Sequence, residues 1–218
     1  MGRVEKGNSR AIMPLPLRVL LGVWMAGVAA ATVLWVPPAK GFRDPEAARL
    51  IIFHVPCAMI AVVAYVISMI YAILHLSRGA PDTDAKSAAS AGLGFVFTVL
   101  ATVTGMVFAQ VEWGRAWNWD PRETSILMLM LVYAAYFALR GAIPSRAARG
   151  RISAAYNILA GLVMPFFVFV MPRVTFSLHP TGTQLSVEYR VVLGCAMVGF
   201  LGLYVWLFRT RVHSRPGE

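Results

Sequence analysis

The stretch IFHVPCAMIAVVAYVISMIYAIL, residues 52–74, contains no Asp, Glu, Lys or Arg in 23 positions. A helix of that length rises about 35 Å, which is enough to cross the roughly 30 Å hydrocarbon core of a bilayer. A buried strand of a soluble protein is usually only about 4 to 8 residues long. The stretch therefore predicts a membrane-spanning helix.

Five further apolar runs of spanning length lie on either side of this stretch, at 17–36, 89–111, 125–139, 152–171 and 190–208. The chain is 58% hydrophobic and 14% charged, with a mean hydropathy of +0.66, whereas a soluble domain is about one quarter charged. We therefore expect an all-α integral membrane protein. Its six transmembrane helices would form a single membrane domain over residues 1–218, without room for a separate soluble catalytic domain.

The first run follows basic residues and ends before two prolines, so it has some features of a secretory signal peptide. At about 20 residues it exceeds the usual apolar core of such a peptide, which is about 7 to 15 residues long. We expect it to be a retained helix.

The net charge of +10 does not indicate a nucleic-acid partner, because the basic residues are unevenly divided between alternate loops. Basic residues concentrate in the cytoplasmic loops of membrane proteins. This rule predicts that both termini are cytoplasmic and that the partners include membrane lipids and no nucleic acid. We expect the protein in the bacterial inner membrane. Of the 20 Lys and Arg residues, thirteen then lie inside: Arg3, Lys6, Arg10, Arg18, Arg78, Lys86, Arg140, Arg146, Arg149, Arg151, Arg209, Arg211 and Arg215.

The predicted topology places the loops 37–50, 112–124 and 172–189 together on the outer, periplasmic face. The loops 75–88 and 140–151 would lie inside. Cys57 and Cys195 stand alone within apolar runs, without CxxC spacing, and such thiols usually act as small hydrophobes. A thiol–disulfide role is not expected.

The outer loop 112–124 holds the sequence WGRAWNWDPRET, residues 113–124, with half of the chain's six tryptophans. Tryptophans are common at bilayer interfaces, but an interfacial belt would scatter them over several helix ends. We interpret Trp113, Trp117 and Trp119, with Arg115 and Arg122, as a surface for a flat, apolar ligand with anionic edges.

Asp120, Pro121 and Glu123 have the spacing of a helix start, with Asp at the N-cap, Pro at the first position and Glu at the third. This capping box predicts that the fourth span begins directly after Trp119. The positive end of the helix dipole would then lie beside the tryptophans, where it favours an anionic group.

Two of the four histidines, His54 and His179, fall in outer segments, each near a proline. We expect Pro56 to open the second span, which would leave His54 in the segment leading to it. Two neutral imidazoles beside aromatic residues and arginines are typical of haem with axial histidines. No cysteine or carboxylate set at zinc spacing accompanies them. His75 and His213, on the inner side, are interpreted as solvated or snorkelling residues.

The loop resembles the tryptophan-rich (WWD) signature of cytochrome c maturation proteins, WGxxWxWDxRxT. Seven residues match it: Trp113, Gly114, Trp117, Trp119, Asp120, Arg122 and Thr124. The six spans and the flanking histidines are similar to the haem exporter C (CcmC) family. Pro121 and Glu123 depart from that family, which usually has leucine at the latter position, and resemble the DPKET of the longer CcsA branch.

The resemblance implies that the chain binds haem b as cargo, with His54 and His179 as iron ligands. The haem-binding set would also include Trp113, Gly114, Trp117, Trp119, Asp120, Arg115 and Arg122. The implied partners are a periplasmic haem chaperone (CcmE-like) and an ATP-binding cassette transporter complex of cytochrome c maturation. Haem handling is implied, without bond-making catalysis by this chain alone.

Three alternatives remain open on the sequence. The chain could be a CcsA-like subunit of a haem-attachment (cytochrome c synthase) system, as DPRET suggests. It could be a b-type electron-transfer cytochrome, although such proteins usually carry histidine pairs near both membrane faces. It could also be a subunit that only scaffolds a transporter and binds no haem.

Overall fold

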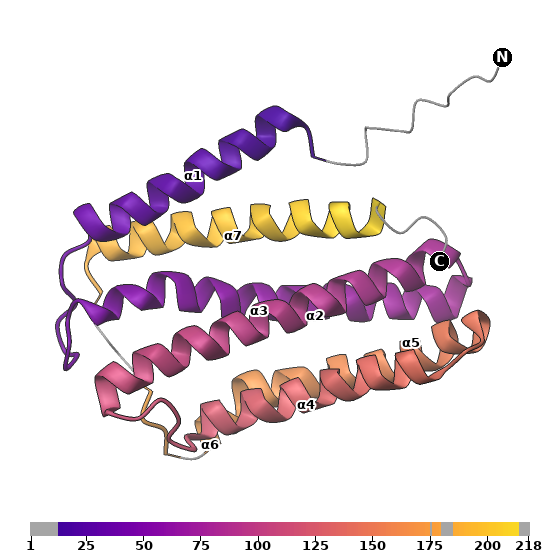
Figure 1. Ribbon diagram of the computed structural model, residues 1–218. Coiled ribbons are helices and arrows are strands. Elements are labelled where there is room, and N and C mark those ends of the chain that lie inside the picture. Colours follow the sequence, from indigo (N-terminus) through magenta and orange to yellow (C-terminus); the bar gives the residue numbers. More distant parts are fainter. Residues whose placement is uncertain (1–12, 175, 180–184, 214–218) are drawn as a thin grey trace.

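The computed structural model describes residues 13–174, 176–179 and 185–213, and within these it is helical with no strand (Figure 1). Six helices are long and apolar enough to cross a membrane, which confirms the predicted fold class and identifies a multi-pass membrane protein. These helices are α1 (Leu15–Leu34), α2 (Ile51–Arg78), α3 (Pro81–Trp113), α4 (Pro121–Ala142), α5 (Arg146–Pro165) and α7 (Val187–His213). Three short elements are η1 (Ala47–Leu50), η2 (Phe166–Val170) and α6 (Met171–Val174).

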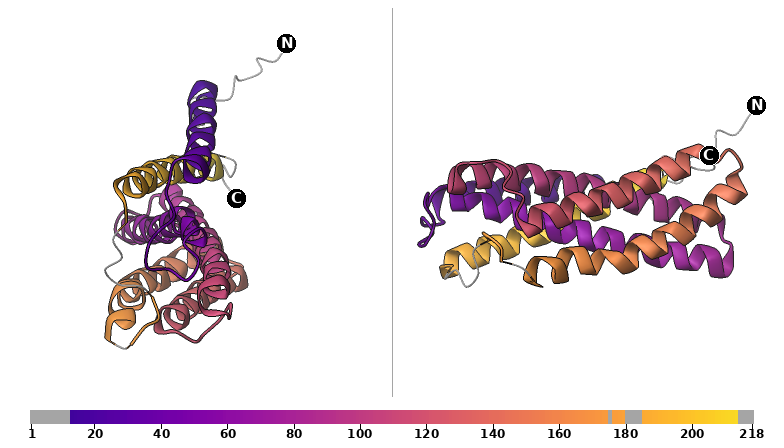
Figure 2. Two further views of the ribbon diagram at one scale, coloured as in Figure 1. Left: turned by 90° about the vertical axis from the view of Figure 1, so that its left-hand side faces the viewer. Right: turned by 90° about the horizontal axis from the view of Figure 1, so that it is seen from below.

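Successive long helices run in opposite directions and form layers, with α1 outermost, then α7, then the α2–α3 pair, then the α4–α5 pair (Figures 1 and 2). One end carries the segments 35–50, 114–120 and 176–179, and we call it the loop end. The opposite end carries the tight connections 79–80 and 143–145, and we call it the turn end. Helix α1 begins and α7 ends on the side of the turn end (Figure 1). The three loops that the topology predicts on one face are therefore at one end of the bundle.

The centre of the bundle lies between the α2–α3 and α4–α5 layers, where large side chains are fully buried. The Tyr65 ring of α2 stacks on Tyr133 of α4, with ring centroids 3.7 Å apart. Gly94 of α3 makes room for Tyr65, because a Cβ at this glycine would lie 2.7 Å from its ring. Close packing of this kind holds helices together in lipid, where burial of apolar surface adds little.

Interhelical hydrogen bonds supplement this packing. The Asn157 amide of α5 donates to the Ser68 hydroxyl of α2 at 2.6 Å and to the Ser87 hydroxyl of α3 at 2.9 Å. The Ser90 hydroxyl is 2.7 Å from the hydroxyl of Tyr204 on α7. Such bonds contribute about 0.6 kcal/mol each on average in a membrane, so they fix the pairing of the helices more than they stabilise the bundle.

Helix α1 is peripheral, and its main packing partner among the described helices is α7. Gly199 and Gly202 of α7 face Met25 and Leu21 of α1, and the Trp24 indole donates to the Cys195 carbonyl at 2.9 Å. Most of the apolar side chains of α1 are exposed within the chain. They would contact lipid or another membrane protein.

The start of α2 differs from the prediction. Pro56 does not open the helix but lies inside it, and His54 belongs to its first turn. Proline removes the hydrogen bond to the carbonyl four residues earlier and its ring crowds that carbonyl, here that of Ile52. The helix continues through because its beginning is fixed: Ile52 and Ala48 are completely buried, and the Tyr189 hydroxyl donates to the Ala48 carbonyl.

Pro165 interrupts the regular α-helix of the fifth span. The α-helix α5 ends there and the five residues of η2 continue as a π-helix into α6. Such turns commonly follow a proline that interrupts the hydrogen-bond ladder. The apolar span nevertheless continues from Arg146 to Val174.

Candidate functional site

The loop between α3 and α4 is held at both of its ends. Gly114 ends α3 with φ of +78°, a left-handed conformation that glycine adopts without strain. At the other end Asp120 and Glu123 form the predicted capping box of α4, which the structure confirms. The Glu123 carboxylate also accepts the Asn118 backbone N–H at 2.7 Å. The loop conformation is therefore determined by residues within the tryptophan-rich motif itself.

The three tryptophans of the loop do not form one continuous wall. Trp117 and Trp119 pair edge to face with centroids 5.8 Å apart, and Trp119 is 69% exposed. Trp119 also has φ of +55°, which is uncommon for a bulky residue. Trp113 instead points to the bundle, where its ring lies 5.6 Å from the His179 ring and 5.8 Å from the Phe108 ring. The motif thus supplies one inner and two outer aromatic groups.

Asp120 connects the cap of α4 to the segment after α6. Its side chain is 1% exposed. It accepts hydrogen bonds from the backbone N–H of Arg122 at 2.9 Å and of Leu178 at 2.6 Å, and from the Ser177 hydroxyl at 3.0 Å. Burial raises the pKa of Asp120, but these hydrogen bonds and the nearby His179 together hold it below its usual value. Asp120 is therefore ionised and positions the segment that carries His179.

His179 lies next to this carboxylate, in the connection between α6 and α7. Its Nδ1 is 3.5 Å from Asp120 Oδ1, which is longer than a good hydrogen bond, so its pairing is incomplete. Burial, with a smaller effect of the Arg122 charge, lowers the pKa of His179 to about 4, although Asp120 opposes the shift. The imidazole is neutral at pH 7. With Nδ1–H directed at the carboxylate, its Nε2 has a free lone pair.

His54 reaches the same region from the first turn of α2. Its Nδ1 lies 3.0 Å from the Ala101 carbonyl oxygen and 3.2 Å from the Thr104 hydroxyl, both on α3. A carbonyl can only accept, so Nδ1 carries the proton and Nε2 is again the unprotonated nitrogen. Gly105 permits this position, because a Cβ there would lie 3.1 Å from the ring. An oxygen acceptor on one ring nitrogen is the usual arrangement for a histidine that binds metal through the other.

Arg122 supplies positive charge to both histidines. Its guanidinium is close enough to act electrostatically on His54 and on His179, and the two imidazoles are close enough to act on each other. Arg173 of α6 adds a second nearby cation. The Nε of Arg122 is buried without a hydrogen-bond partner among the described residues. Neither Arg122 nor Arg173 forms an ion pair with a carboxylate among the described residues, so both are open to an anionic ligand.

The predicted residues are thus only partly gathered together. His54, His179, Trp113 and Asp120 meet at the loop end together with Arg122. The other four lie in the loop: Gly114, Arg115, Trp117 and Trp119. The Arg115 side chain is exposed, and its carbonyl accepts the Asn118 amide at 3.0 Å. Gly114, Arg115 and Trp119 are exposed and Trp117 is half-buried, so this part of the loop can be reached from outside the bundle.

Sequence reasoning missed the groups that orient the histidines. The Ala101 carbonyl, Gly105 and Ser177 carry no recognisable pattern, because their roles depend on which helix turn packs against His54 or Asp120. Arg173 follows Pro172 within the predicted outer loop 172–189. Its place in an outer loop was the one indication that the sequence offered. A cation there could pair with the anionic edge of a ligand, as was predicted for Arg122.

The arrangement could hold one metal through two imidazole nitrogens, between aromatic and basic side chains. No group of three or more His, Cys, Asp or Glu residues that could hold a metal ion occurs among the described residues. A closed metal site, with all ligands from protein side chains, is therefore not formed by this part of the chain. Two nitrogens suit a metal whose other positions are already filled.

Comparisons with known proteins agree on one relationship. Residues 5–179 match the family described as cytochrome c assembly protein. The chain is 31% identical to heme exporter protein C of Paracoccus denitrificans over 207 residues, covering 88% of this chain and 85% of that protein. It is 30% identical to heme exporter protein C of Escherichia coli K12 over 199 residues, covering 87% and 80%. The Rhodobacter capsulatus protein of that name is 29% identical, covering 93% and 91%.

Proposed function

The chain belongs to the family of cytochrome c assembly proteins, and from this we propose that it binds haem b at the loop end and delivers it to a periplasmic haem chaperone. The observation that carries the proposal is the pair of histidines. Each has Nδ1 directed at an oxygen acceptor, and each therefore keeps Nε2 free for iron. The names of its relatives, heme exporter protein C, are consistent with haem as the cargo.

The surroundings of the two imidazoles suit the rest of a haem molecule. Trp113 lies against His179 and contributes an aromatic face for the porphyrin. Arg122 and Arg173 lie near each other without an ion-pair partner among the described residues, and they can pair with propionate groups. Because His179 is neutral at pH 7, no proton has to leave it before iron binds.

The exposed part of the tryptophan loop is our proposed handover surface. Trp119 is largely exposed beside Trp117, so a haem edge near them would be accessible from outside the bundle. We propose that a CcmE-like chaperone collects haem there, and that an ATP-binding cassette complex of cytochrome c maturation takes part in release. The loop end would then face the periplasm of a bacterial inner membrane, with the basic turn end in the cytoplasm.

The test is an absorption spectrum of the protein purified from membranes, followed by transfer of its haem to a purified haem chaperone. The wild type is expected to show a haem with axial histidines and to load the chaperone covalently. The double variant His54→Ala, His179→Ala should lose both the spectrum and the loading. A double variant that kept the wild-type spectrum would contradict the ligand assignment.

Two further measurements separate the alternative functions. If the chain and a cytochrome partner attached haem directly to a CxxCH substrate without the chaperone, the protein would be a haem-attachment subunit. If bound haem exchanged electrons between quinone and an outer acceptor, it would be an electron-transfer cytochrome. A pure protein without haem would indicate a scaffold.

A further inference from the structure

A groove between α2 and α7 lies far from the histidine site, near the turn end. It has a volume of about 350 Å³, which is within the range of small-molecule sites. Its lining comes from two helices: Ile67, Ile70 and Tyr71 of α2, and Tyr204, Val205, Phe208 and Arg209 of α7. All of these except Arg209 are apolar or aromatic. The groove therefore suits a hydrocarbon chain along most of its length.

The aromatic side chains of the groove are held in place by a hydrogen bond and by stacking on one another. Tyr204 is 2% exposed, and its hydroxyl is bonded to Ser90 of α3 at 2.7 Å. Phe208 lies with its ring nearly parallel to that of Tyr204 and to that of Tyr71, with centroids 5.9 and 6.0 Å away. The groove is thus a preformed feature of the α2–α7 interface.

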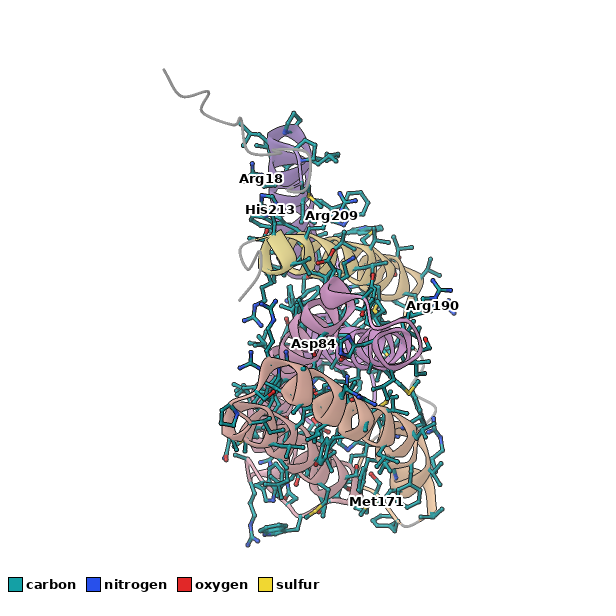
Figure 3. All side chains as sticks on the ribbon, turned by 90° about the vertical axis from the view of Figure 1, so that its right-hand side faces the viewer. Arg18, Asp84, Met171, Arg190, Arg209 and His213 are labelled. Carbon is teal, nitrogen blue, oxygen red and sulfur yellow. The ribbon has the colours of Figure 1, made fainter. Side chains whose placement is uncertain are left out.

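One cation lines the groove, and a second lies over an aromatic ring that lines it. Arg209 lines it directly, and the Lys86 ammonium of α3 lies 5.8 Å from the centroid of the Tyr71 ring. Neither has a carboxylate within ion-pair distance in the described part of the chain. The nearby Asp84 is already paired with Arg140, and Figure 3 shows it between the α2–α3 and α4–α5 layers, away from Arg209 on α7. The part of the groove near Arg209 and Tyr71 is therefore electropositive.

This combination has a natural ligand in a bilayer. The groove opens on the lipid-facing side of a six-span bundle, so a lipid chain can enter it without crossing water. Basic residues between transmembrane helices, near one membrane surface, bind the headgroups of anionic lipids. We propose that this groove is a binding site for an anionic phospholipid, with an acyl chain between α2 and α7 and its phosphate at Arg209 and Lys86.

Native mass spectrometry of the full-length protein in detergent tests the proposal, with phosphatidylglycerol and phosphatidylcholine as probes. Phosphatidylglycerol is expected to bind more tightly. Each of Arg209→Gln and Lys86→Gln should weaken its binding about fivefold, as expected for one basic residue near a headgroup. The matched control is Arg151→Gln, an exposed arginine on α5 at the same end but in the opposite layer. It should leave binding unchanged.

A second variant tests the groove itself. Val205→Trp places an indole in the groove and should weaken binding of both lipids, while leaving the haem spectrum unchanged. Equal binding of the two lipids, or an equal loss in Arg151→Gln, would overturn the proposal. So would unchanged lipid binding in Val205→Trp. Haem retention is measured in the same samples, so that failure of the haem proposal is seen separately from failure of this one.

Discussion

Helix α2 carries a histidine near each end, and the two have different surroundings. At the loop end, Nδ1 of His54 faces a carbonyl of α3, and the ring lies near His179 and Arg122. At the turn end, Nδ1 of His75 faces the Ala80 carbonyl and the Thr83 hydroxyl, both at 3.3 Å. Its Nε2 faces the backbone of Gly150. Both rings are oriented, but only His54 shares its environment with a second imidazole and an unneutralised cation.

The carboxylates at the two ends differ in the same way. Asp84 forms a bidentate ion pair with Arg140 at 2.7 and 2.6 Å, so the two charges neutralise each other. Asp120 accepts mainly from backbone N–H groups and the Ser177 hydroxyl, and no arginine among the described residues forms an ion pair with it. Paired charges of this kind fix the packing of helices. Oriented imidazoles beside unpaired cations are what a binding site requires.

Replacing the histidines one at a time should have the largest effect. His54→Ala removes one axial nitrogen, and we expect haem retained on purification to fall at least about tenfold, with loss of the six-coordinate spectrum. His75→Ala removes a ring at the turn end, whose Nδ1 faces the Ala80 carbonyl and the Thr83 hydroxyl, and it should keep the wild-type spectrum. Pyridine haemochrome assay per mole of protein gives both results. An equal loss in the two variants would show that the ends are functionally alike.

The two aspartates provide the second contrast. In Asp120→Asn an amide nitrogen that cannot accept replaces one oxygen, so either the Leu178 N–H at Oδ2 or the groups at Oδ1, with His179 among them, lose their acceptor. The segment that carries His179 is then held less firmly. Haem affinity is expected to fall about tenfold, with little change in thermal stability. Asp84→Asn should lower thermal stability and leave haem affinity unchanged. It leaves Arg140 unpaired at a half-buried position, which costs about 2 kcal/mol. Haem titration and thermal melts of both variants in the same detergent decide the point.

The fold was accessible from sequence because length and apolarity determine a membrane span. The run 52–74 is contained in α2, and the capping box formed at Asp120 and Glu123 as its spacing predicted. These are local properties in which neighbouring residues determine the outcome. The same local reasoning failed at Pro56, since burial of Ile52 and Ala48 in contacts with distant residues decided where α2 begins.

The candidate site was only partly accessible. His54, His179 and the tryptophan motif stand out by residue type, and the alternating loops indicated that they share one end. The orientation of each imidazole could not be predicted, because it depends on the turn of α3 that packs against α2 and on a carboxylate 59 positions away from His179. The separation of Trp113 from Trp117 and Trp119 depends on the left-handed Gly114 and Trp119.

A pair of glycines gives the third test. A Cβ at Gly105 would lie 3.1 Å from the His54 ring, and one at Gly150 would lie 2.8 Å from Nε2 of His75. Gly105→Ala should tilt the His54 ring and lower haem affinity severalfold, with a shifted spectrum. Gly150→Ala should cost about 1 to 3 kcal/mol through overpacking and leave the spectrum unchanged. A normal spectrum in Gly105→Ala would show that His54 tolerates displacement and is not closely positioned.

The helix caps should show the smallest difference between the two ends. Glu123→Leu removes the acceptor of two backbone N–H groups, those of Asn118 at 2.7 Å and Asp120 at 3.3 Å. It should cost about 1 kcal/mol, as loss of a cap usually does. At the turn end, Ser145→Ala removes the 3.5 Å cap of α5. That bond is long, so the loss should be less than about 0.5 kcal/mol.

Haem transfer distinguishes whether the larger cap also serves the site. Asp120 keeps its bonds to Arg122, Leu178 and Ser177 in Glu123→Leu, so the position of His179 is preserved and haem retention should remain within about twofold of the wild type. The tryptophan loop, however, loses its anchor at Asn118. If chaperone loading slows while haem retention is unchanged, the cap of α4 fixes the handover surface and Asp120 alone fixes the ligand.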